Sequence, residues 1–160
     1  MDGVAIRPFT DADAEWIVAR HDALYARDEG FDATFAVLVG RIVADFVATH
    51  DPRRERGWIA VRGGVRLASI FCVRQTEEVA KLRLFLVEPE ARGTGLAQAM
   101  LDTCMGFARD AGYRRMTLWT HESHRAAGRL YARNGFALAD AKPAFSFGVD
   151  VVEQQWEIAL

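Results

Sequence analysis

The chain of 160 residues is long enough for one domain with a well-buried core and too short for two ordinary ones, so we expect a single domain over residues 1–160. A hydrophobic content of 51% with 26% charged residues excludes a disordered chain, and a net charge of −2 from scattered charges argues against a nucleic-acid partner. No apolar run reaches the roughly twenty residues of a membrane span and the first residues lack a signal peptide, which predicts a cytoplasmic protein without a membrane partner.

The first part of the chain predicts one strand and two helices. Residues 4–9 form the expected strand, and Thr10 nearly matches a capping box for a helix that continues to about residue 27. Gly30 interrupts this helix. A second helix begins near Asp32, keeps its apolar residues at helical spacing, and stops before Pro52, because the residue before a proline disfavours helical backbone.

The middle of the chain predicts three strands. Residues 58–62 and 65–74 are rich in apolar side chains and flank Gly63-Gly64, a pair suited to the positive φ angles of a two-residue hairpin turn. The third strand, residues 81–87, has apolar side chains on both faces, as a strand in the middle of a sheet requires.

The last part of the chain predicts two helices and three strands. A helix follows Gly95 and continues to about residue 110, a strand covers residues 115–120, and a further helix covers residues 123–133. Strands at 136–139 and 151–160 complete the pattern. The order β-α-α-β-β-β-α-β-α-β-β predicts a mixed α/β (α+β) fold whose central sheet is mostly antiparallel, with one parallel strand pair and helices on both faces.

The connection between the strand at 81–87 and the following helix is the strongest candidate for a binding site. Pro89 ends the strand, and Arg92-Gly93-Thr94-Gly95 places two residues without a Cβ directly before the helix. The first-turn N–H groups of a helix have no intrahelical acceptor and lie at the positive end of the helix dipole. The segment therefore predicts a phosphate cradle, with a tight loop that binds nothing as the alternative.

Two familiar nucleotide-binding motifs do not fit this segment. A P-loop requires Lys and then Ser or Thr after its second glycine, whereas Leu96 and Ala97 follow Gly95. The dinucleotide-binding fingerprint requires a third small residue where the chain has Gln98. These mismatches argue against a site for ATP or NAD.

Two short motifs flank the strand at residues 115–120. Arg92, Gly95 and Ala97 meet the pattern Arg/Gln-x-x-Gly-x-Gly/Ala, and the segment from His124 to Phe136 is similar to Asn-x-x-Ala-x-x-Leu-Tyr-x-x-x-Gly-Phe. Their order and separation make the pair much more specific than either motif alone. With both motifs, the chain resembles the GNAT superfamily of acyl-CoA-dependent N-acetyltransferases.

Three further segments narrow the resemblance. Leu118-Trp119-Thr120, Ser146-Phe147-Gly148 and Gln155-Trp156-Glu157 are similar to segments in the acetyltransferase half of proteins that fuse a MarR-type DNA-binding domain to a GNAT domain. No part of this sequence is expected to form the DNA-binding half. The GNAT resemblance also implies that the two parallel strands splay apart beside the glycine turn and that the thioester lies between them.

The resemblance implies acetyl-CoA as the co-substrate. Its pyrophosphate would lie on the backbone of the glycine turn, and its pantetheine arm would pair with backbone groups that also donate an N–H to the thioester oxygen. His124 stands where the family has Asn, so its imidazole either contacts the pantetheine arm or flanks the helix at the surface. The expected cofactor-binding residues are Leu86, Val87, Arg92, Gly93, Thr94, Gly95, Leu96, Ala97 and His124.

Acetyl transfer to an amine also requires proton transfer. The resemblance implies that Tyr131 protonates the departing thiolate, with packing beneath the sheet as its alternative role. Some family members use a glutamate as the base on the strand before the glycine turn, where this chain has Lys81 and Arg83. The candidate bases are therefore Glu122 and His121, acting through water, unless both are solvated loop residues.

The acceptor is expected to be a small-molecule or peptide amine. Family geometry would place its site at residues 25–31, where the pair Asp28-Glu29 either attracts a cationic amine or is an ordinary charged turn. Cys72 and Cys104 have no second Cys or His at metal-ligand spacing, so we expect two buried thiols and no metal. The oligomeric state stays open between a monomer and a homodimer.

The sequence supports three functional hypotheses. The first is an N-acetyltransferase that uses acetyl-CoA by direct attack in a ternary complex, without a covalent enzyme intermediate. The second is a catalytically silent CoA- or acyl-CoA-binding module for sensing or interaction, suggested by the missing strand carboxylate. The third is a nucleotide-binding domain, which the two failed motif comparisons disfavour.

Overall fold

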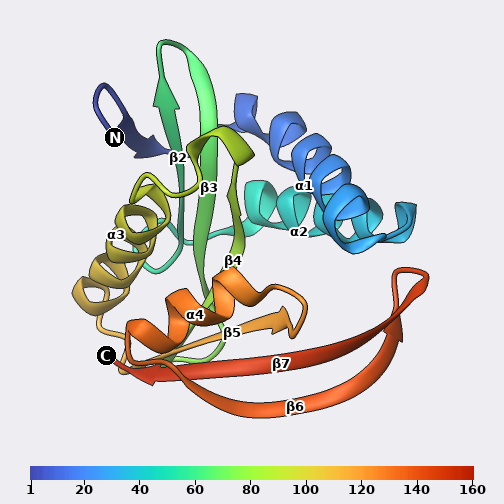
Figure 1. Cartoon of the computed structure of the whole chain (residues 1–160). Coiled ribbons are helices and arrows are strands. Elements are labelled where there is room, and N and C mark those ends of the chain that lie inside the picture. Colours follow the sequence, from blue (N-terminus) through green and yellow to red (C-terminus); the bar gives the residue numbers. More distant parts are fainter. The chain divides into compact units, whose positions relative to one another are not determined.

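The computed structural model describes residues 1–160 and follows the expected order of strands and helices (Figure 1). The strands are β1 (Ala5–Pro8), β2 (Arg56–Arg62), β3 (Val65–Arg74), β4 (Val79–Val87), β5 (Arg115–His121), β6 (Ala137–Ser146) and β7 (Val149–Ala159). The helices are α1 (Ala14–Glu29), α2 (Ala33–Thr49), α3 (Leu96–Asp110) and α4 (Arg125–Arg133), with short 3₁₀ turns η1 (Asp11–Asp13) and η2 (Pro89–Ala91).

The seven strands form one sheet with the order β1-β2-β3-β4-β5-β7-β6. Neighbours β1 and β2, β2 and β3, β3 and β4, and β6 and β7 are antiparallel, and the sheet contains one parallel pair. The predicted mixed α/β fold with a mostly antiparallel sheet is therefore confirmed.

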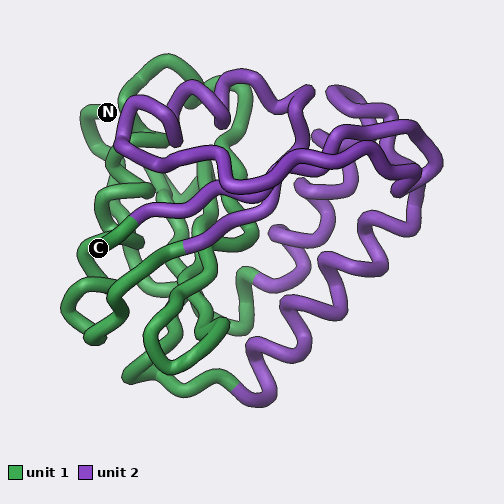
Figure 2. Tube along the Cα trace, turned by 90° about the horizontal axis from the view of Figure 1, so that it is seen from below, with its two compact units in different colours: residues 1–13, 50–116, 159–160 green, residues 14–49, 117–158 purple.

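The chain divides into two compact units (Figure 2). Unit 1 consists of Met1–Asp13, His50–Met116 and Ala159–Leu160, and unit 2 consists of Ala14–Thr49 and Thr117–Ile158. Unit 1 thus holds β1 to β4 and α3, while unit 2 holds α1, α2, α4 and β6 with most of β5 and β7.

Unit 1 is built on the four antiparallel strands β1 to β4, with α3 packed against β3 and β4. Phe71 of β3 is fully buried, and the ring centre of Phe9 lies 5.1 Å from its own. A Cβ on Gly57 would lie 2.4 Å from the Phe71 ring, so glycine is required at this position of β2. Cys72 and Cys104 are free, buried thiols, as the sequence predicts.

A buried carboxylate fixes the turn that precedes α1. Asp13 is fully buried and accepts hydrogen bonds from Arg7 at 2.8 Å, from Arg66 at 2.7 Å and from the Thr10 N–H at 2.8 Å. Burial alone would raise the pKa of Asp13, but the hydrogen bonds from Arg7, Thr10 and Arg66 hold it well below its usual range. The expected helix start at Thr10 is therefore a 3₁₀ turn, and α1 begins at Ala14.

Unit 2 contains the helix pair α1–α2 and the hairpin β6–β7. Helix α4 lies close to β7: a Cβ on Gly128 would stand 3.8 Å from the Trp156 ring, and the ring centres of Tyr131 and Trp156 are 6.3 Å apart. The connection between α1 and α2 is tied to the hairpin turn, because the Asp32 N–H donates to the Phe147 carbonyl at 2.9 Å.

The hairpin β6–β7 is longer than the sequence indicates. Strand β6 continues to Ser146, well beyond the expected end at residue 139, and turns at Phe147 (φ 56°) and Gly148 (φ 80°). Pro143 lies inside β6 opposite Val152, a position that an edge strand tolerates because one side of it carries no ladder hydrogen bonds.

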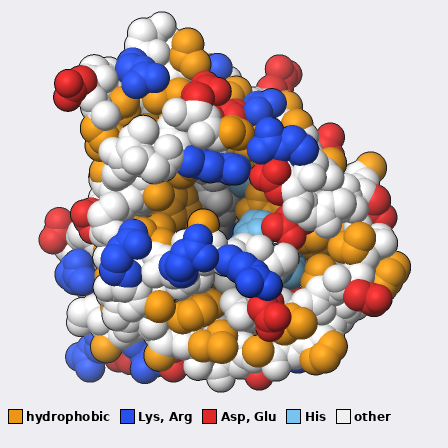
Figure 3. All heavy atoms as spheres, viewed as in Figure 1, with side chains coloured by type: hydrophobic (Ala, Val, Ile, Leu, Met, Phe, Trp, Pro, Cys, Tyr) orange, Lys and Arg blue, Asp and Glu red, His pale blue; other side chains and the backbone are white.

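The surface mixes the two signs of charge. On the face drawn in Figure 3, Lys and Arg side chains lie among acidic and hydrophobic side chains. None of the helices combines the length and the apolar character needed to cross a membrane.

Candidate active site

Strand β4 bends just before the glycine turn. Ser69 of β3 lies opposite Leu86, and Phe71 lies opposite Arg83, so β4 carries an extra residue in this interval. Leu84 takes a φ of 51°, and the buried Ser69 hydroxyl donates a 2.6 Å hydrogen bond to its carbonyl oxygen. Bulges of this kind redirect a strand beside a binding site. This one immediately precedes Leu86 and Val87, the residues expected to face the pantetheine arm.

The glycine turn leads into α3 through two positive φ angles. Gly93 has a φ of 74°, and Gly95 has a φ of 88° as the N-cap of α3. The Thr94 hydroxyl donates to the Ala91 carbonyl at 2.5 Å and lies 3.4 Å from the Leu96 nitrogen, which braces the turn from within. The conformation is one that glycine adopts without the strain a side chain would add.

The approach to this turn is open. A Cβ on Gly93 would meet no atom within 4 Å, and one on Gly95 would meet only Met1 Cγ at 4.0 Å. Residues 92–95 are exposed at the surface. Because the first-turn N–H groups of α3 lack intrahelical acceptors, the turn fits the pyrophosphate of acetyl-CoA. The Arg92 Nε donates to the Val87 carbonyl at 3.2 Å, which holds the side chain beside the end of β4.

In unit 2, a carboxylate joins the end of α1 to the residues before α4. His124 Nε2 lies 2.9 Å from Glu29 Oε1, and the Ser123 hydroxyl donates to Glu29 Oε2 at 2.5 Å. The side chains of Glu29 and His124 are only 10% and 19% exposed. His124 is the N-cap of α4 but makes no side-chain cap hydrogen bond, so its imidazole is committed to the carboxylate.

His121 is half-buried beside this pair. Its ring centre lies 5.2 Å from that of Phe31, 6.3 Å from that of Phe147 and 6.1 Å from that of His124. Burial, and then the positive charge of His124, lower the pKa of His121, while Glu153 and Glu29 oppose the change. The imidazole is therefore neutral at pH 7 and able to accept a proton.

The two remaining catalytic candidates differ in exposure. Glu122 is exposed, and its backbone N–H donates to the Val152 carbonyl at 2.9 Å. Tyr131 is buried, with its ring centre 5.5 Å from that of Phe136. Its immediate contacts fit the packing role that the sequence allows, and the acid role stays a prediction.

The predicted site residues fall into two sets. Unit 1 holds Leu86, Val87 and residues 92–97, and unit 2 holds His121, Glu122, His124 and Tyr131. No group of three or more His, Cys, Asp or Glu side chains is placed to hold a metal ion.

Sequence reasoning missed the commitment of Glu29 to His124. Asp28 and Glu29 were expected to act alike, but Asp28 pairs with Arg27 at 2.9 Å, whereas Glu29 turns inward. The available signal was helical spacing, because His21, Tyr25 and Glu29 recur every four residues and share one face of α1.

The family to which the chain belongs follows from a match to a known family. Residues 13–136 match the model of the family described as "Acetyltransferase (GNAT) family". The chain belongs to the GNAT family. This confirms the resemblance drawn from the two motifs around Gly95 and Tyr131.

Curated relatives of this GNAT chain include two mycothiol acetyltransferases. The protein from Pseudarthrobacter chlorophenolicus is 28% identical over 149 residues, which cover 87% of this chain and 44% of the relative. The protein from Nocardiopsis dassonvillei is 30% identical over 146 residues, which cover 86% of this chain and 43% of the relative. This chain therefore spans less than half the length of these relatives.

Solved structures confirm the GNAT fold. An acetyltransferase from Streptococcus agalactiae superposes with a TM-score of 0.83 at 19% identity, covering 100% of both chains. The yncA protein of Salmonella typhimurium, solved with its cofactor acetyl-CoA, superposes with a TM-score of 0.80 at 18% identity, covering 99% of this chain and 95% of that one. At these identities the likeness shows the fold alone.

Proposed function

We propose that this GNAT chain is an N-acetyltransferase that transfers an acetyl group from acetyl-CoA to a primary amine by direct attack in a ternary complex. The observation that supports this function most is the open turn at the start of α3, where Gly93 and Gly95 take positive φ angles with no packing reason to be glycine. Residues 1–160 act as one catalytic domain in the cytoplasm.

Unit 1 binds the co-substrate. Acetyl-CoA supplies the reactive thioester. The backbone from Gly93 to Ala97 holds its phosphate groups, with the Arg92 guanidinium as an additional donor. Backbone N–H groups near Leu86 and Val87 donate to the thioester oxygen, a contact worth roughly 3 kcal/mol by comparison with other acyl transfers.

Unit 2 supplies the proton acceptor. An alkyl amine with a pKa near 10.4 loses its proton at pH 7 at a cost of about 4.6 kcal/mol, so a base lowers the barrier. His121 suits this role better than Glu122, because its imidazole is neutral and half-buried among aromatic rings, whereas Glu122 is exposed. We assign His121 as the base, acting directly or through one water.

Tyr131 is the proposed acid for the departing thiolate. Tyr131→Phe keeps the ring and its packing against Phe136 but removes the hydroxyl. We expect kcat to fall by about 10- to 100-fold with little change in the Kd for CoA, since general acid catalysis contributes on that scale. Steady-state kinetics with calorimetric CoA titration measures both values. An unchanged kcat would contradict the role of Tyr131 as the acid and leave packing as its only role.

The acceptor is a small-molecule or peptide amine. Three relatives are mycothiol acetyltransferases by name, which supports acetyl transfer. Glu29 is already paired with His124, so the connection at residues 25–31 offers rings from Tyr25 and Phe31 more than free negative charge. We therefore expect amines with an apolar part to be better acceptors than polyamines.

A second function is favoured by one feature of β4. Its charged side chains are Lys81 and Arg83, with no carboxylate to serve as the base that some family members place there. Together with the likeness to the acetyltransferase half of MarR–GNAT fusions, this supports a silent CoA-binding module that senses acyl-CoA or binds a partner, including a second copy of the chain.

One experiment separates the two functions. Thiol release from acetyl-CoA is measured with a panel of arylalkyl amines, polyamines, amino acids, aminoglycosides and peptide N-termini, alongside calorimetric CoA titration. Turnover with any amine supports the enzyme and names its substrate class. Tight CoA binding without turnover across the panel supports the silent module, and weak CoA binding contradicts both.

A further inference from the structure

Glu29 is a carboxylate that the fold withdraws from water. Its side chain is 10% exposed, and its two oxygens contact different residues, His124 Nε2 at 2.9 Å and the Ser123 hydroxyl at 2.5 Å. Its neighbour Asp28, by contrast, keeps a more exposed side chain and pairs with Arg27. Withdrawing a charge from water costs several kcal/mol unless it is paired, so the position of Glu29 requires its two partners.

When it is protonated, the His124 imidazole balances the charge of Glu29. A carboxylate at ion-pair distance from an imidazole nitrogen favours the protonated ring. The His124 ring also stands 4.9 Å from the Tyr25 ring centre, on the side of α1 that carries Glu29. His124, the N-cap of α4, is thus joined to Glu29 in the last turn of α1, and both residues belong to unit 2.

His121 lies within reach of this charge. The charged groups that act on it come from three elements: Glu29 at the end of α1, His124 at the start of α4 and Glu153 on β7. Phe31 and Phe147 border the ring with apolar edges. His124 disfavours a second positive charge on His121, whereas Glu29 and Glu153 favour one.

We propose that Glu29 and His124 are positioning residues for His121. Glu29, held by Ser123, keeps the protonated His124 ring beside His121, and this positive charge adds to the burial of the His121 ring in favouring the neutral imidazole that accepts the proton of the acceptor amine. The inference rests on the proposed acetyltransferase function. In the step itself, the ammonium N–H bond breaks, its electron pair stays on the amine nitrogen, and the proton moves to an unprotonated ring nitrogen of His121.

The arrangement divides two roles between two imidazoles. His124 pairs with the Glu29 carboxylate at 2.9 Å, and the half-buried His121 lies beside it with its ring bordered by Phe31 and Phe147. The Glu29–His124 pair has no net charge when His124 is protonated, but its two members act on His121 unequally: the effect of His124, whose ring centre is 6.1 Å away, is larger than that of Glu29. Removing the cation alone should therefore have a larger effect than removing both members.

The first test is His124→Gln. We expect the titration midpoint of His121 to rise by on the order of one pH unit, because the protonated His124 ring, centred 6.1 Å away, is lost while both carboxylates remain. Histidine ring signals in ¹H–¹³C NMR of the full chain report the midpoint, with the chain's 4 histidines assigned by single substitution. The acid limb of kcat/KM should move upward by the same amount.

The second test is the double variant Glu29→Gln with His124→Gln. We expect the midpoint of His121 to return close to that of the parent, because a cation and an anion are removed together. Glu29→Gln alone should move the midpoint less than His124→Gln. Asp22→Asn is the matched control, since it removes one exposed carboxylate from the same helix, and it should change neither the midpoint nor the rate.

The outcomes distinguish failure of the positioning role of Glu29 and His124 from failure of the proposed acetyltransferase function. An unmoved His121 midpoint in His124→Gln, or an equal shift in the double variant, would overturn the positioning role, even if both variants lose thermal stability. If the parent acetylates no amine, the proposed function fails while the NMR titrations still decide the electrostatic role of the pair. If turnover persists unchanged in His121→Gln, the base assignment fails although the chain remains an acetyltransferase.

Discussion

At the scale of single residues, the clearest coupling between folding and pH lies at His21 of α1. Its Nδ1–H donates to the Ile17 carbonyl at 2.7 Å, and its buried Nε2 has no hydrogen-bond partner. Burial lowers the pKa of His21 from 6.5 to about 4, and the backbone hydrogen bond opposes this only in part. A charged ring at this position would be buried without a counter-ion.

This predicts how stability depends on pH. Between pH 4 and pH 6.5 the unfolded chain binds a proton at His21 that the folded chain does not, so the free energy of unfolding rises with pH by about 3 kcal/mol across this window. His21→Leu should remove this contribution, flattening the dependence whatever its effect at pH 7. Urea unfolding at several pH values measures the slope. An equal slope in variant and parent would contradict the buried neutral imidazole.

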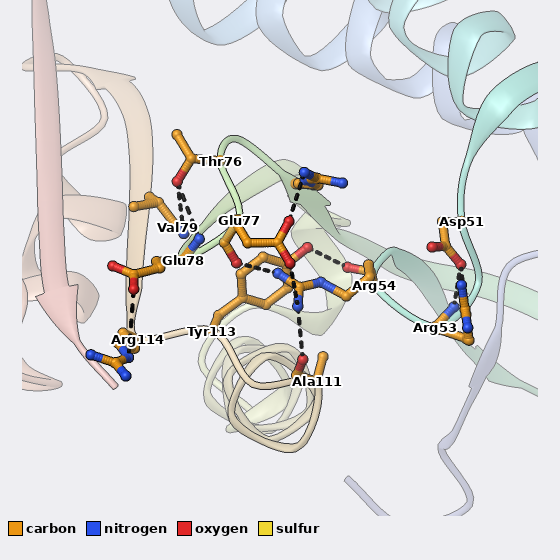
Figure 4. A network of polar contacts seen from close by, with 11 residues as sticks. Asp51, Arg53, Arg54, Thr76, Glu77, Glu78, Val79, Ala111, Tyr113 and Arg114 are labelled. Atoms are coloured by element: carbon orange, nitrogen blue, oxygen red, sulfur yellow. Dashed lines mark hydrogen bonds and ion pairs between the residues drawn. The ribbon is translucent and has the colours of Figure 1, made fainter.

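At the scale of elements, one side chain joins three connections of unit 1 (Figure 4). Arg54, between α2 and β2, donates to the Ala111 carbonyl at 3.2 Å and to the Glu77 carbonyl. Its guanidinium lies 4.0 Å from the ring centre of Tyr113, whose hydroxyl donates to the Arg54 carbonyl at 2.7 Å. The loops after α2, β3 and α3 are thereby fixed to one another.

Arg54→Met should therefore weaken the whole of unit 1. Met keeps much of the apolar stem, but the Ala111 and Glu77 carbonyls lose their donor and the contact with Tyr113 changes. We expect the Tm to fall by roughly 5 °C, measured by calorimetry. Arg53→Met is the matched control, because that side chain is 89% exposed with one 3.6 Å ion pair, and its Tm should stay close to that of the parent. Equal losses in both variants would contradict the role of Arg54.

At the scale of the whole molecule, binding of the co-substrate should raise the free energy of unfolding. A ligand that binds only the folded chain raises the free energy of unfolding by about 2.7 kcal/mol at a concentration of 100 times Kd. We expect CoA to raise the Tm of the parent in this concentration-dependent way, because the turn at the start of α3 is complete only in the folded chain.

Gly95→Val should abolish this stabilisation, since a branched side chain would occupy the space where phosphate approaches the backbone. A valine at position 95 also lowers stability through backbone strain, because Gly95 has a φ of 88°, whether or not CoA binds there. The control is therefore Gly112→Val, which introduces the same strain at a φ of 91° beyond the other end of α3. The control should lose a similar amount of stability and keep the shift with CoA. If CoA raises the Tm of Gly95→Val as much as that of the parent, the turn at the start of α3 is not part of the co-substrate site.

The order of strands and helices and the turn at Gly95 could be predicted from the amino-acid sequence alone. Hydrophobic spacing and glycine positions are local signals, so they can be interpreted without knowledge of the fold. The same reasoning failed at β6, where it predicted a short strand over residues 136–139 and the structure has Ala137–Ser146, with Pro143 inside it. An edge strand accepts a proline, and only the sheet reveals which strand is at the edge.

The partners of the charged side chains, by contrast, could be assigned only from the folded structure. Asp28 and Glu29 are adjacent and chemically alike, yet one lies at the surface and the other binds His124, far along the chain. Likewise, Asp13 reads as part of a capping box but also binds Arg66, a residue of β3. A carboxylate takes its partner from whichever element packs beside it, and that contact is not encoded in local sequence spacing. The physical reason is that pairing depends on distance in space, whereas periodicity reports only distance along the chain.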